Sequence, residues 1–449
     1  MNSDAMNPNS PHSQSDSPNP SLHSRRSFLG LTGAFAGAAT FAAGLPIARS
    51  AHAAGSDLIR LAFIGCGGRG TGAASQALST SGPVKLVAMA DLFADRIETS
   101  LGHLLKNEAI RGKIDVPPER RFTGFDAYRR AIESGVDMVI LTTVPHFRPI
   151  HYAAAVAAGK HVYMEKPVAV DGPGVRAVMG ANEEARKKKL AVAVGFQRRH
   201  QNSCRECIQQ IRDGKIGDVR MIRSYYLMGG IVSGRSKTPE QTEMEYQIRN
   251  WLYFTWLSGD HFVEQTVHAV DVGNWVANAC PIKAHGLGGR QVRNGPGTGQ
   301  IFDHGVVEYE FANGCRHLVF ARQIPGCFTQ VNLFALGTKG EMSVGGGLVE
   351  LGRGNSKAVN AYQVQHDRLF AAIHAGQPFF EGDYAATSAM SAIMGRMALY
   401  SGKEVTWDAA LNSKLSLSPA KYALDADPPV LPDKDGKYPV AVPGNTVAW

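Results

Sequence analysis

The chain has 449 residues, of which 44% are hydrophobic and 19% are charged, as in a globular protein large enough for two domains. Its formal net charge is +8, from 47 basic and 39 acidic residues. The longest basic run, residues 186–189, ends a predicted helix, where cations suit the helix dipole and solvent. The charge pattern therefore argues against nucleic acid as a partner.

The first 53 residues have the features of an export leader. Residues 1–24 are rich in Asn, Ser, Pro and Asp and cannot bury apolar surface, so we expect them to be disordered. Residues 24–29 (SRRSFL) form a twin-arginine signal, followed by an Ala- and Gly-rich apolar run and an A-x-A cleavage site at residues 51–53. Ala and Gly favour membrane transfer less than Leu or Ile, which argues against a stable anchor after cleavage. We therefore expect the twin-arginine machinery to export the folded protein, to the periplasm or beyond.

A glycine turn follows the first apolar run of the mature chain. Residues 58–64 are strand-like, and residues 65–70 are G-C-G-G-R-G before a helical stretch. This G-x-G-x-x-G spacing permits a tight turn, a close approach to a pyrophosphate, and helix N-terminal amides aimed at its charge. Asp91 ends the next apolar run, roughly 20 residues after Gly70, where a carboxylate accepts hydrogen bonds from a ribose 2′-OH. The two signals together predict NAD rather than NADP.

Short apolar runs alternate with amphipathic stretches as far as residue 195, which predicts a parallel sheet covered by helices on both faces. The buried strand 137–142 ends where the open edge of such a sheet meets its ligand. Strand 161–164 leads directly into Glu165-Lys166-Pro167, and the proline places Lys166 beside the expected nicotinamide. The predicted nucleotide-binding residues are Gly65, Gly67, Gly68, Arg69, Gly70, Asp91, Thr142, Pro145, His146, Glu165 and Lys166.

Three motifs resemble the glucose-fructose oxidoreductase, inositol dehydrogenase and MocA-like family: the glycine turn, the E-K-P tripeptide, and an acidic residue followed four positions later by histidine. Here the last pair is Glu264 and His268, with Glu in place of the commoner Asp. The resemblance implies an α/β protein with an NAD-binding Rossmann domain at residues 54–195. It also implies an α+β domain at 196–360, whose mostly antiparallel open sheet makes substrate and subunit contacts in a homo-oligomer.

The pattern of the second half agrees with a sheet that has one free face. Residues 219–227 are strand-like, and residues 306–311 alternate with period two before Asn313-Gly314, a hairpin signal. Residues 331–336 and 341–344 form a second predicted hairpin. Helices at 366–375 and 384–401, within the C-terminal segment 361–449, should pack back on both domains.

Lys166, Glu264 and His268 are the predicted catalytic residues. If the chain is helical from residue 260 onward, Glu264 and His268 share a face. Histidine suits proton transfer near neutral pH, and like charge and desolvation can lower the pKa of a lysine beside an oxidised nicotinamide toward the same range. Either His268 or Lys166 would remove a sugar hydroxyl proton while hydride leaves the same carbon. Glu264 would bind a neighbouring hydroxyl or orient the base.

An aromatic-rich stretch around residue 251 offers flat faces for a sugar ring, and nearby polar side chains offer partners for hydroxyls. The lone C-x-x-C at residues 204–207 lacks further ligands, so we expect helix packing and no metal site. Asp271 either binds substrate or braces its helix. The predicted substrate-binding residues are Gln197, Arg198, Tyr225, Tyr226, Arg249, Trp251, Tyr253 and Asp271.

The predicted location constrains the reaction, because an exported enzyme lacks a supply of free NAD and a reductase to regenerate it. We therefore expect a sugar oxidoreductase that holds its NAD through a redox-neutral cycle, with Cys66 and Arg69 as candidates for retention. The leader and residues 67–70 (GGRG) also resemble family 109 of the glycoside hydrolases, which implies an NAD-dependent glycosidase in which Tyr225 or Tyr226 transfers the leaving-group proton. A carbohydrate-binding protein that uses the nucleotide only structurally is a third alternative.

Overall fold

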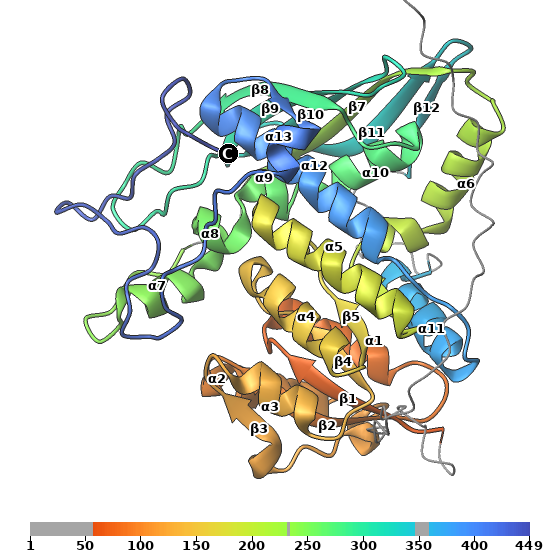
Figure 1. Ribbon diagram of the computed structural model, residues 1–449, viewed down its shortest axis with the longest axis vertical. Helices are drawn as coiled ribbons and strands as arrows, with labels where there is room; N and C mark the ends of the chain where they lie inside the picture. The colour runs from red at the N-terminus through yellow and green to blue at the C-terminus, as the bar shows by residue number, and fades with distance from the viewer. Residues whose placement is uncertain (1–56, 231–233, 346–358) are drawn as a thin grey trace, which may run out of the picture. The chain divides into compact units, whose positions relative to one another are not determined.

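The computed structural model describes residues 57–230, 234–345 and 359–449 (Figure 1). The predicted leader and its cleavage site lie outside the described residues. Among the described helices, none is long and apolar enough to cross a membrane.

Six parallel strands form the first sheet, in the order β3-β2-β1-β4-β5-β6. Their interior residues are almost all buried. This agrees with their continuous apolar runs, which predicted a sheet covered by helices on both faces. The strand order reverses between β1 and β4, which is where ligands bind in open parallel sheets. The strands are β1 (Ile59–Ile64), β2 (Val84–Asp91), β3 (Arg121–Thr123), β4 (Met138–Leu141), β5 (His161–Met164) and β6 (Val192–Val194).

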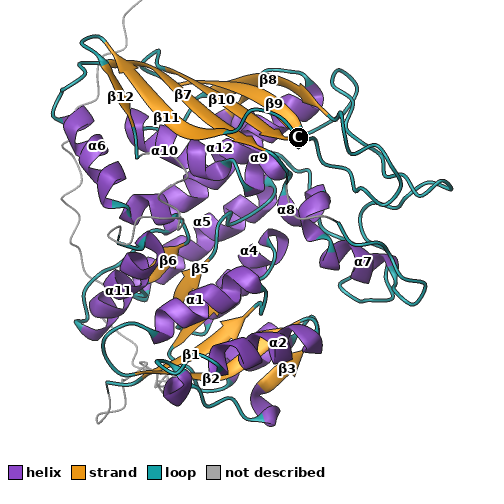
Figure 2. Ribbon diagram, turned by 180° about the vertical axis from the view of Figure 1, so that it is seen from behind, coloured by secondary structure: helices purple, strands orange, loops and turns teal. Residues whose placement is uncertain are grey.

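Helices cover both faces of this sheet (Figure 2). One apolar cluster joins the sheet to α1 (Gly68–Leu78), α2 (Ala94–Leu105) and α11 (Ala361–His374). A second joins its other face to α3 (Ala127–Glu133), α4 (Arg148–Ala157) and α5 (Gly172–Lys187). Short 3₁₀ helices occupy the connections: η1 (Arg111–Lys113), η2 (Pro118–Arg120), η3 (Pro145–Phe147) and η4 (Gln197–His200).

The second sheet has the order β12-β11-β7-β10-β9-β8-β13. Its neighbouring strands are antiparallel except for the parallel pair β7 and β10. Both predicted hairpins are confirmed, and Gly314 supplies the left-handed turn residue of the first, at φ +80°. The strands are β7 (Val219–Met228), β8 (Lys283–Gly289), β9 (His304–Glu310), β10 (Arg316–Gln323), β11 (Gln330–Gly337), β12 (Glu341–Ser343) and β13 (Val405–Thr406).

Side chains of β9, β10 and β11 alternate between buried and partly exposed, so only one face of the second sheet is packed. The packed face meets α10 (Val267–Ala277) and α12 (Gly382–Ser401), and α12 runs between the two sheets (Figures 1 and 2). Small residues allow this close packing: a Cβ on Gly395 would lie 2.2 Å from the Tyr309 hydroxyl. The remaining helices near this sheet are α6 (Asn202–Arg212) and α13 (Trp407–Leu411).

The C-terminal segment contributes to both parts of the molecule. Helix α11 covers the first sheet, whereas β13 pairs with β8 at the edge of the second. Between β7 and β8 the chain makes a long excursion through α7 (Glu243–Arg249), η5 (Trp251–Tyr253), α8 (Thr255–Ser258) and α9 (His261–Glu264). A third apolar cluster joins this excursion to the C-terminal tail and to side chains of the first domain.

Candidate functional site

A cavity of about 520 Å³ lies along the carboxyl ends of the first sheet's strands, a volume within the usual range of ligand sites. Its walls include the glycine turn, the residues that follow β2, β4, β5 and β6, and side chains from α7 to α10. Both halves of the chain therefore contribute to one cavity.

The glycine turn is shaped to admit a ligand at one surface and to pack tightly at the other. Gly65 has φ +98°, and a Cβ there would lie 2.3 Å from the backbone nitrogen of Thr143. A Cβ on Gly70 would lie 2.4 Å from the Gly65 carbonyl oxygen, whereas Cβ atoms on Gly67 and Gly68 would meet no described atom within 4 Å. Since α1 begins at Gly68, its amide groups point at this open surface. These residues fit the pyrophosphate of a dinucleotide.

Asp91 lies on the cavity wall at the end of β2. Its Oδ2 accepts a hydrogen bond from the Cys66 amide at 2.6 Å and its Oδ1 accepts one from the Phe93 amide at 3.0 Å. Burial raises the pKa of Asp91, an effect that these amides partly offset. Each carboxylate oxygen keeps a further lone pair for a ribose hydroxyl. Cys66 lies behind the turn with its thiol bonded to the Ala90 carbonyl, so it packs the turn and does not line this cavity.

An ion pair joins the glycine turn to the E-K-P tripeptide. Arg69 Nε lies 2.8 Å from Glu165 Oε1, and Tyr163 donates its hydroxyl to the same oxygen at 2.8 Å. Burial disfavours the ionised carboxylate, but the charges of Arg69 and Lys166 outweigh it and lower the pKa of Glu165. The guanidinium of Arg69 also lies 4.5 Å from the ring centre of Tyr362 on α11. Arg69 thus joins the glycine turn to the E-K-P tripeptide and to α11 at the cavity wall.

Lys166 forms a second, largely buried ion pair. Its Nζ lies 2.8 Å from Glu264 Oε1 and also donates to the Glu264 carbonyl. The two side chains are only 11% and 9% exposed, so the longer Glu side chain reaches the lysine without difficulty. Within the described part of the chain, Glu264 Oε2 has no hydrogen-bond partner.

The condition that the chain is helical from residue 260 onward is met only in part, because the chain forms α9 and α10 with a break at Gln265 and Thr266. The amides of both break residues donate to the His261 carbonyl, which interrupts the regular ladder. Glu264 and His268 nevertheless both line the cavity, one from each helix. Burial lowers the pKa of His268 well below its ordinary value, and the charges of Lys166 and Arg198 lower it further. His268 is therefore a neutral imidazole at physiological pH.

Further polar side chains surround this group. Gln197 and Arg198 of η4 line the cavity, and Gln197 Oε1 has no hydrogen-bond partner among the described residues. Tyr226 also lines it and donates its hydroxyl to Gln265 Oε1 at 2.9 Å. Burial raises the pKa of Tyr226, and the nearby Glu264 carboxylate raises it further, so its hydroxyl keeps its proton.

Four residues predicted from the sequence do not reach the cavity. Tyr225 points to the opposite face of β7 from Tyr226 and stacks on Phe320, with ring centres 5.1 Å apart. The sequence analysis assigned both Tyr225 and Tyr226 to the substrate site, although the side chains of neighbouring strand residues point to opposite faces of the sheet. Asp271 is fully buried and bound by Arg199 at 2.8 Å and by Ser388, so it braces α10 rather than binding substrate.

The other two are His146 and Tyr253. His146 is buried and bonded to the Tyr422 hydroxyl at 2.8 Å, and Tyr253 is buried in the third apolar cluster. Their partners lie in the C-terminal tail and in the excursion, which are remote in sequence. Pro145 and Thr142 do line the cavity, and Thr142 Oγ1 donates to the Gly65 carbonyl at 2.6 Å.

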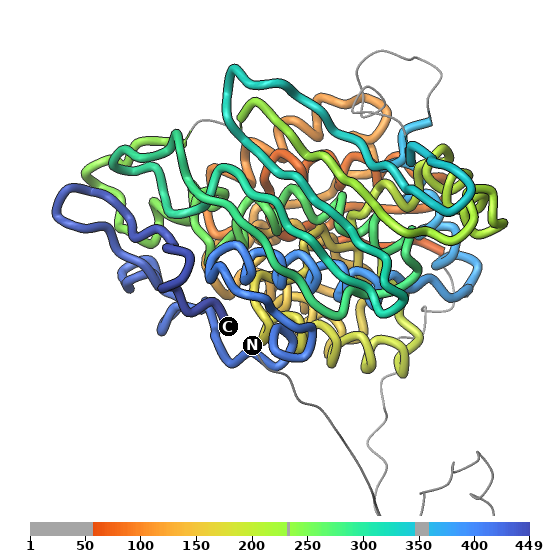
Figure 3. The backbone as a smooth tube through the Cα atoms, turned by 90° about the horizontal axis from the view of Figure 1, so that it is seen from above, coloured from red at the N-terminus to blue at the C-terminus, as the bar shows by residue number. Residues whose placement is uncertain are grey.

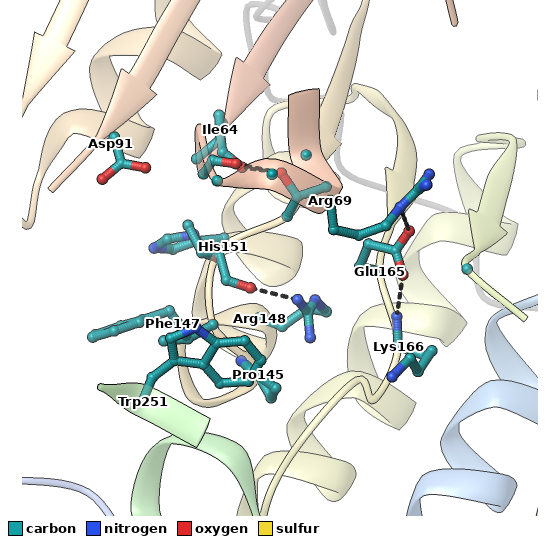
Figure 4. Close-up of a pocket in the computed structure, with 18 of the residues that line it drawn as sticks. Ile64, Arg69, Asp91, Pro145, Phe147, Arg148, His151, Glu165, Lys166 and Trp251 are labelled. Carbon is teal, nitrogen blue, oxygen red and sulfur yellow. Dashed lines mark hydrogen bonds and ion pairs between the residues drawn. The ribbon is translucent and has the colours of Figure 1, made fainter. Parts of the chain in front are cut away.

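The sequence analysis missed Arg148, which lines the cavity and is only 2% exposed. It donates to the carbonyls of Pro167 and Thr143 and thus joins the ends of β4 and β5, while burial lowers its pKa to about 10. Its position just beyond the end of a buried strand was the available signal. In Figure 4, Asp91, His151 and Trp251 lie on one side of the cavity, and Glu165 and Lys166 lie on the other.

Within the described ranges, no three His, Cys, Asp or Glu side chains are grouped closely enough to hold a metal ion. The described cysteines are free thiols, and Cys204 and Cys207 lie on α6.

Comparisons with known proteins agree with this arrangement. Residues 59–196 match the model of an oxidoreductase family with an NAD-binding Rossmann fold. The inositol 2-dehydrogenase of Acidiphilium cryptum is 24% identical over 258 residues, which are 58% of this chain and 65% of that protein. That of Azotobacter vinelandii is 28% identical over 142 residues, 32% of this chain and 41% of the relative. The chain thus spans less than two thirds of either relative.

Solved structures share the fold over a larger region. The scyllo-inositol dehydrogenase of Lactobacillus casei with bound NAD(H) and scyllo-inositol aligns with a TM-score of 0.59 at 17% identity, over 78% of this chain and 99% of that one. The aldose-aldose oxidoreductase of Caulobacter crescentus aligns with a TM-score of 0.59 at 19% identity, over the same shares. Residues 59–196 are thus similar to the NAD-binding glucose-fructose oxidoreductase, inositol dehydrogenase and MocA-like family, and a larger region of the chain shares the fold of these solved structures.

Proposed function

We propose that the protein is an NAD-dependent oxidoreductase that oxidises a secondary hydroxyl of a sugar or related polyol. The observation that carries the proposal is the group of Lys166, Glu264 and His268 at the E-K-P end of the cavity, beside the unpartnered oxygen of Gln197. A polyhydroxylated ligand supplies hydroxyl donors for such buried acceptors, which are costly to leave unpaired. Two of the similar proteins are inositol 2-dehydrogenases, which supports a sugar or related polyol as the substrate.

The side chains divide the acid-base work between them. His268 accepts the proton of the reacting hydroxyl. Its lowered pKa keeps the imidazole neutral, so one ring nitrogen is unprotonated and can accept a proton. Lys166, held by Glu264, donates a hydrogen bond to the same oxygen and stabilises its developing negative charge. The nicotinamide of a dinucleotide whose pyrophosphate is held at the glycine turn would supply the acceptor for the hydride that leaves the carbinol carbon. One C–H and one O–H bond break, and a carbonyl forms.

We further propose that the cofactor is retained through a redox-neutral cycle in an exported protein. The support is the twin-arginine leader, since the exported enzyme would meet no free NAD to replace what it released. On this proposal the same site oxidises a polyol as its first substrate and then reduces a carbonyl compound as its second. Native preparations that contain no nucleotide would contradict retention.

An NAD-dependent glycosidase is the second candidate, and the position of Tyr226 favours it. The Tyr226 hydroxyl lies at the cavity wall, and its raised pKa keeps the proton that a leaving glycosidic oxygen needs. Aryl glycosides would then be cleaved without net formation of NADH, and Tyr226→Phe would abolish cleavage.

The outer face of the second sheet supports a homo-oligomer as a further proposal. Figure 3 looks onto this sheet, whose strands run across the view. On its outer face the rings of Phe320 and Phe334 each lie against Tyr225, and Leu287 is 72% exposed on β8. An exposed patch of aromatic and aliphatic side chains on a mixed surface of this kind is typical of a protein contact. Light scattering of the purified protein tests it.

The oxidoreductase proposal is tested by adding a panel of inositols and monosaccharides to the purified protein and recording NADH absorbance. We expect at least one polyol to give a signal in the wild type, and Lys166→Met to lose the signal while still binding NADH. Lys187→Met, an exposed lysine at the end of α5, is the matched control. A wild type that binds NADH but oxidises no polyol, in net or exchange assays, would overturn the proposal.

A further inference from the structure

One segment of the second half of the chain lies over the nucleotide domain at the side of the cavity away from Lys166. We call residues 243–253, which comprise α7 and η5, the cover segment. Its side chains Ile248, Arg249 and Trp251 line the cavity together with Leu92 and Phe93, which follow Asp91. The sequence analysis assigned Arg249 and Trp251 to the sugar, yet Figure 4 shows Trp251 opposite Lys166.

Arg249 fixes the cover segment to the start of α2. Its Nη1 and Nη2 lie 3.2 and 3.1 Å from the two carboxylate oxygens of Asp95, and its Nε lies 2.8 Å from Glu245. The guanidinium also lies 3.7 Å from the ring centre of Phe93. The hydrogen bonds from Arg249 hold the pKa of Asp95 below its usual range. This two-pronged pair with a stacked ring is geometry that lysine does not reproduce.

The cover segment is also anchored from behind. Gln247 donates to the Val430 carbonyl at 2.7 Å and accepts from Trp256 Nε1 at 2.7 Å, and Tyr438 donates to Glu243. The C-terminal tail, dark blue in Figure 1, runs beside α7. Leu92, Phe93 and Phe125 of the first domain share one apolar cluster with the segment and the tail. The cover is therefore a packed wall.

The position of Asp91 decides which half of a dinucleotide this wall meets. An acidic residue at the end of the second strand binds the adenosine ribose, and Phe93 and Asp95 follow it directly in the chain. Lys166, Glu264 and His268 occupy the other end. The surfaces of Trp251, Phe125 and Phe147 are flat and largely apolar, which suits a purine ring.

We propose that the cover segment encloses the adenosine half of NAD, with Trp251 against the adenine and the Arg249–Asp95 pair as the clasp that slows release. This inference rests on the NAD-dependent function proposed above and deepens it, because it assigns retention to a segment outside the Rossmann domain. The clasp lies between two elements, so nucleotide release requires the pair to separate or the wall to shift.

The test measures nucleotide release without any turnover. Protein loaded with NADH is mixed with excess NAD, and the decay of bound NADH fluorescence gives the release rate; competition gives the affinity for ADP-ribose, which lacks nicotinamide. The variants are Arg249→Ala, Asp95→Ala and Trp251→Ala. Asp95 is 59% exposed and absent from the cavity wall, so its variant separates the clasp from cavity shape and from folding.

Arg186→Ala is the matched control. Arg186 pairs with Asp383 and lies 4.9 Å from the Phe380 ring centre, the same combination of partners at a position outside the cavity. We expect Arg249→Ala and Asp95→Ala to release NADH about tenfold faster and Trp251→Ala to bind ADP-ribose about tenfold more weakly, with the control unchanged. Lys166→Met should leave ADP-ribose binding unchanged.

Unchanged NADH release and ADP-ribose affinity in folded Arg249→Ala and Asp95→Ala proteins would overturn the proposal. So would a raised KM for the polyol with normal ADP-ribose affinity, since Arg249 would then serve the sugar. The NADH release rate and the ADP-ribose affinity are independent of catalysis: a protein that holds ADP-ribose through the clasp but oxidises no polyol would refute the proposed function and leave the cover intact.

Discussion

Lys166 and Glu264 form the ion pair on which the proposed chemistry depends. Both residues were identified from short motifs. Lys166 belongs to the E-K-P tripeptide that directly follows a predicted strand, and Glu264 is the acidic residue four positions before His268. Their contact across 98 positions of sequence was not predictable from spacing. The sequence analysis gave Glu264 the roles of binding a hydroxyl or orienting a base, and the structure places its carboxylate on the lysine itself.

Glu264→Gln should lower kcat about 100-fold with a smaller effect on KM, because it removes the charge that holds Lys166 in place. Glu264→Asp keeps that charge on a shorter side chain and should retain more activity than Glu264→Gln. Steady-state kinetics with the best polyol compare the three proteins. Equal activity of wild type and Glu264→Gln would show that the ion pair is not needed for the reaction.

His268 sets the expected pH dependence. As the base, it acts when deprotonated, and its lowered pKa extends that form to lower pH. The acidic limb of the kcat/KM profile should therefore lie below about 6.5, the ordinary histidine value. His268→Asn should lose about 100-fold or more of kcat/KM and also lose that limb. An unchanged profile in His268→Asn would assign the base to another residue.

At the scale of elements, regular features were predictable and irregular ones were not. The alternation of strands and helices, the glycine turn and the hairpin at Asn313-Gly314 follow from local patterns and are confirmed. The start of α9 depends on Asp260, which has φ +85° and accepts from the amides of Phe262 and Phe302. The Phe302 contact comes from a distant loop, so no local pattern signals where α9 begins.

The glycine turn provides a matched pair of substitutions. A Cβ on Gly67 meets open space, so Gly67→Ala should keep the free energy of unfolding within about 0.5 kcal/mol of wild type while weakening NADH binding about tenfold. A Cβ on Gly70 would lie 2.4 Å from Thr142 Oγ1, so Gly70→Ala should destabilise the fold by about 2 kcal/mol.

Urea unfolding and NADH titration measure the two effects separately. Full NADH affinity in Gly67→Ala would argue that the ligand does not approach this surface.

At the scale of the whole molecule, the least predictable feature is the packing of the excursion and the C-terminal tail on the first domain. His146 was predicted to bind nucleotide because it follows β4, yet it lies outside the cavity and is hydrogen-bonded to the hydroxyl of Tyr422 in the C-terminal tail. Tyr253 was predicted to bind sugar because it lies in an aromatic-rich stretch of the sequence, but it is buried among residues of the excursion. Both outcomes depend on contacts between segments far apart in sequence.

Buried histidines should make the folded protein sensitive to acid. Burial lowers the pKa values of His146 and His366 to about 4 and those of His151 and His317 to about 3. The folded values lie below the unfolded value near 6.5, so the associated stability is present above that pH and is lost as the pH falls below it. Each should cost on the order of 1 kcal/mol by about pH 5.5.

Urea unfolding between about pH 7.5 and 5.5 measures this loss. His317→Gln should flatten the slope by about one proton, whereas His285→Gln, at an exposed position, should not. A stability that does not change over this range would refute the assignment.

The central claim is that hydride moves between a polyol carbon and a bound nicotinamide, and isotope transfer tests it most directly. The purified protein is incubated with polyols that carry deuterium on their carbinol carbons, and the nucleotide is then analysed by mass spectrometry. Deuterium enters the nicotinamide whether turnover is a net oxidation, a redox-neutral exchange or an oxidation step in glycoside cleavage. We predict labelled nucleotide with the wild type and none with Lys166→Met; bound nucleotide that stays unlabelled with every polyol would contradict the account.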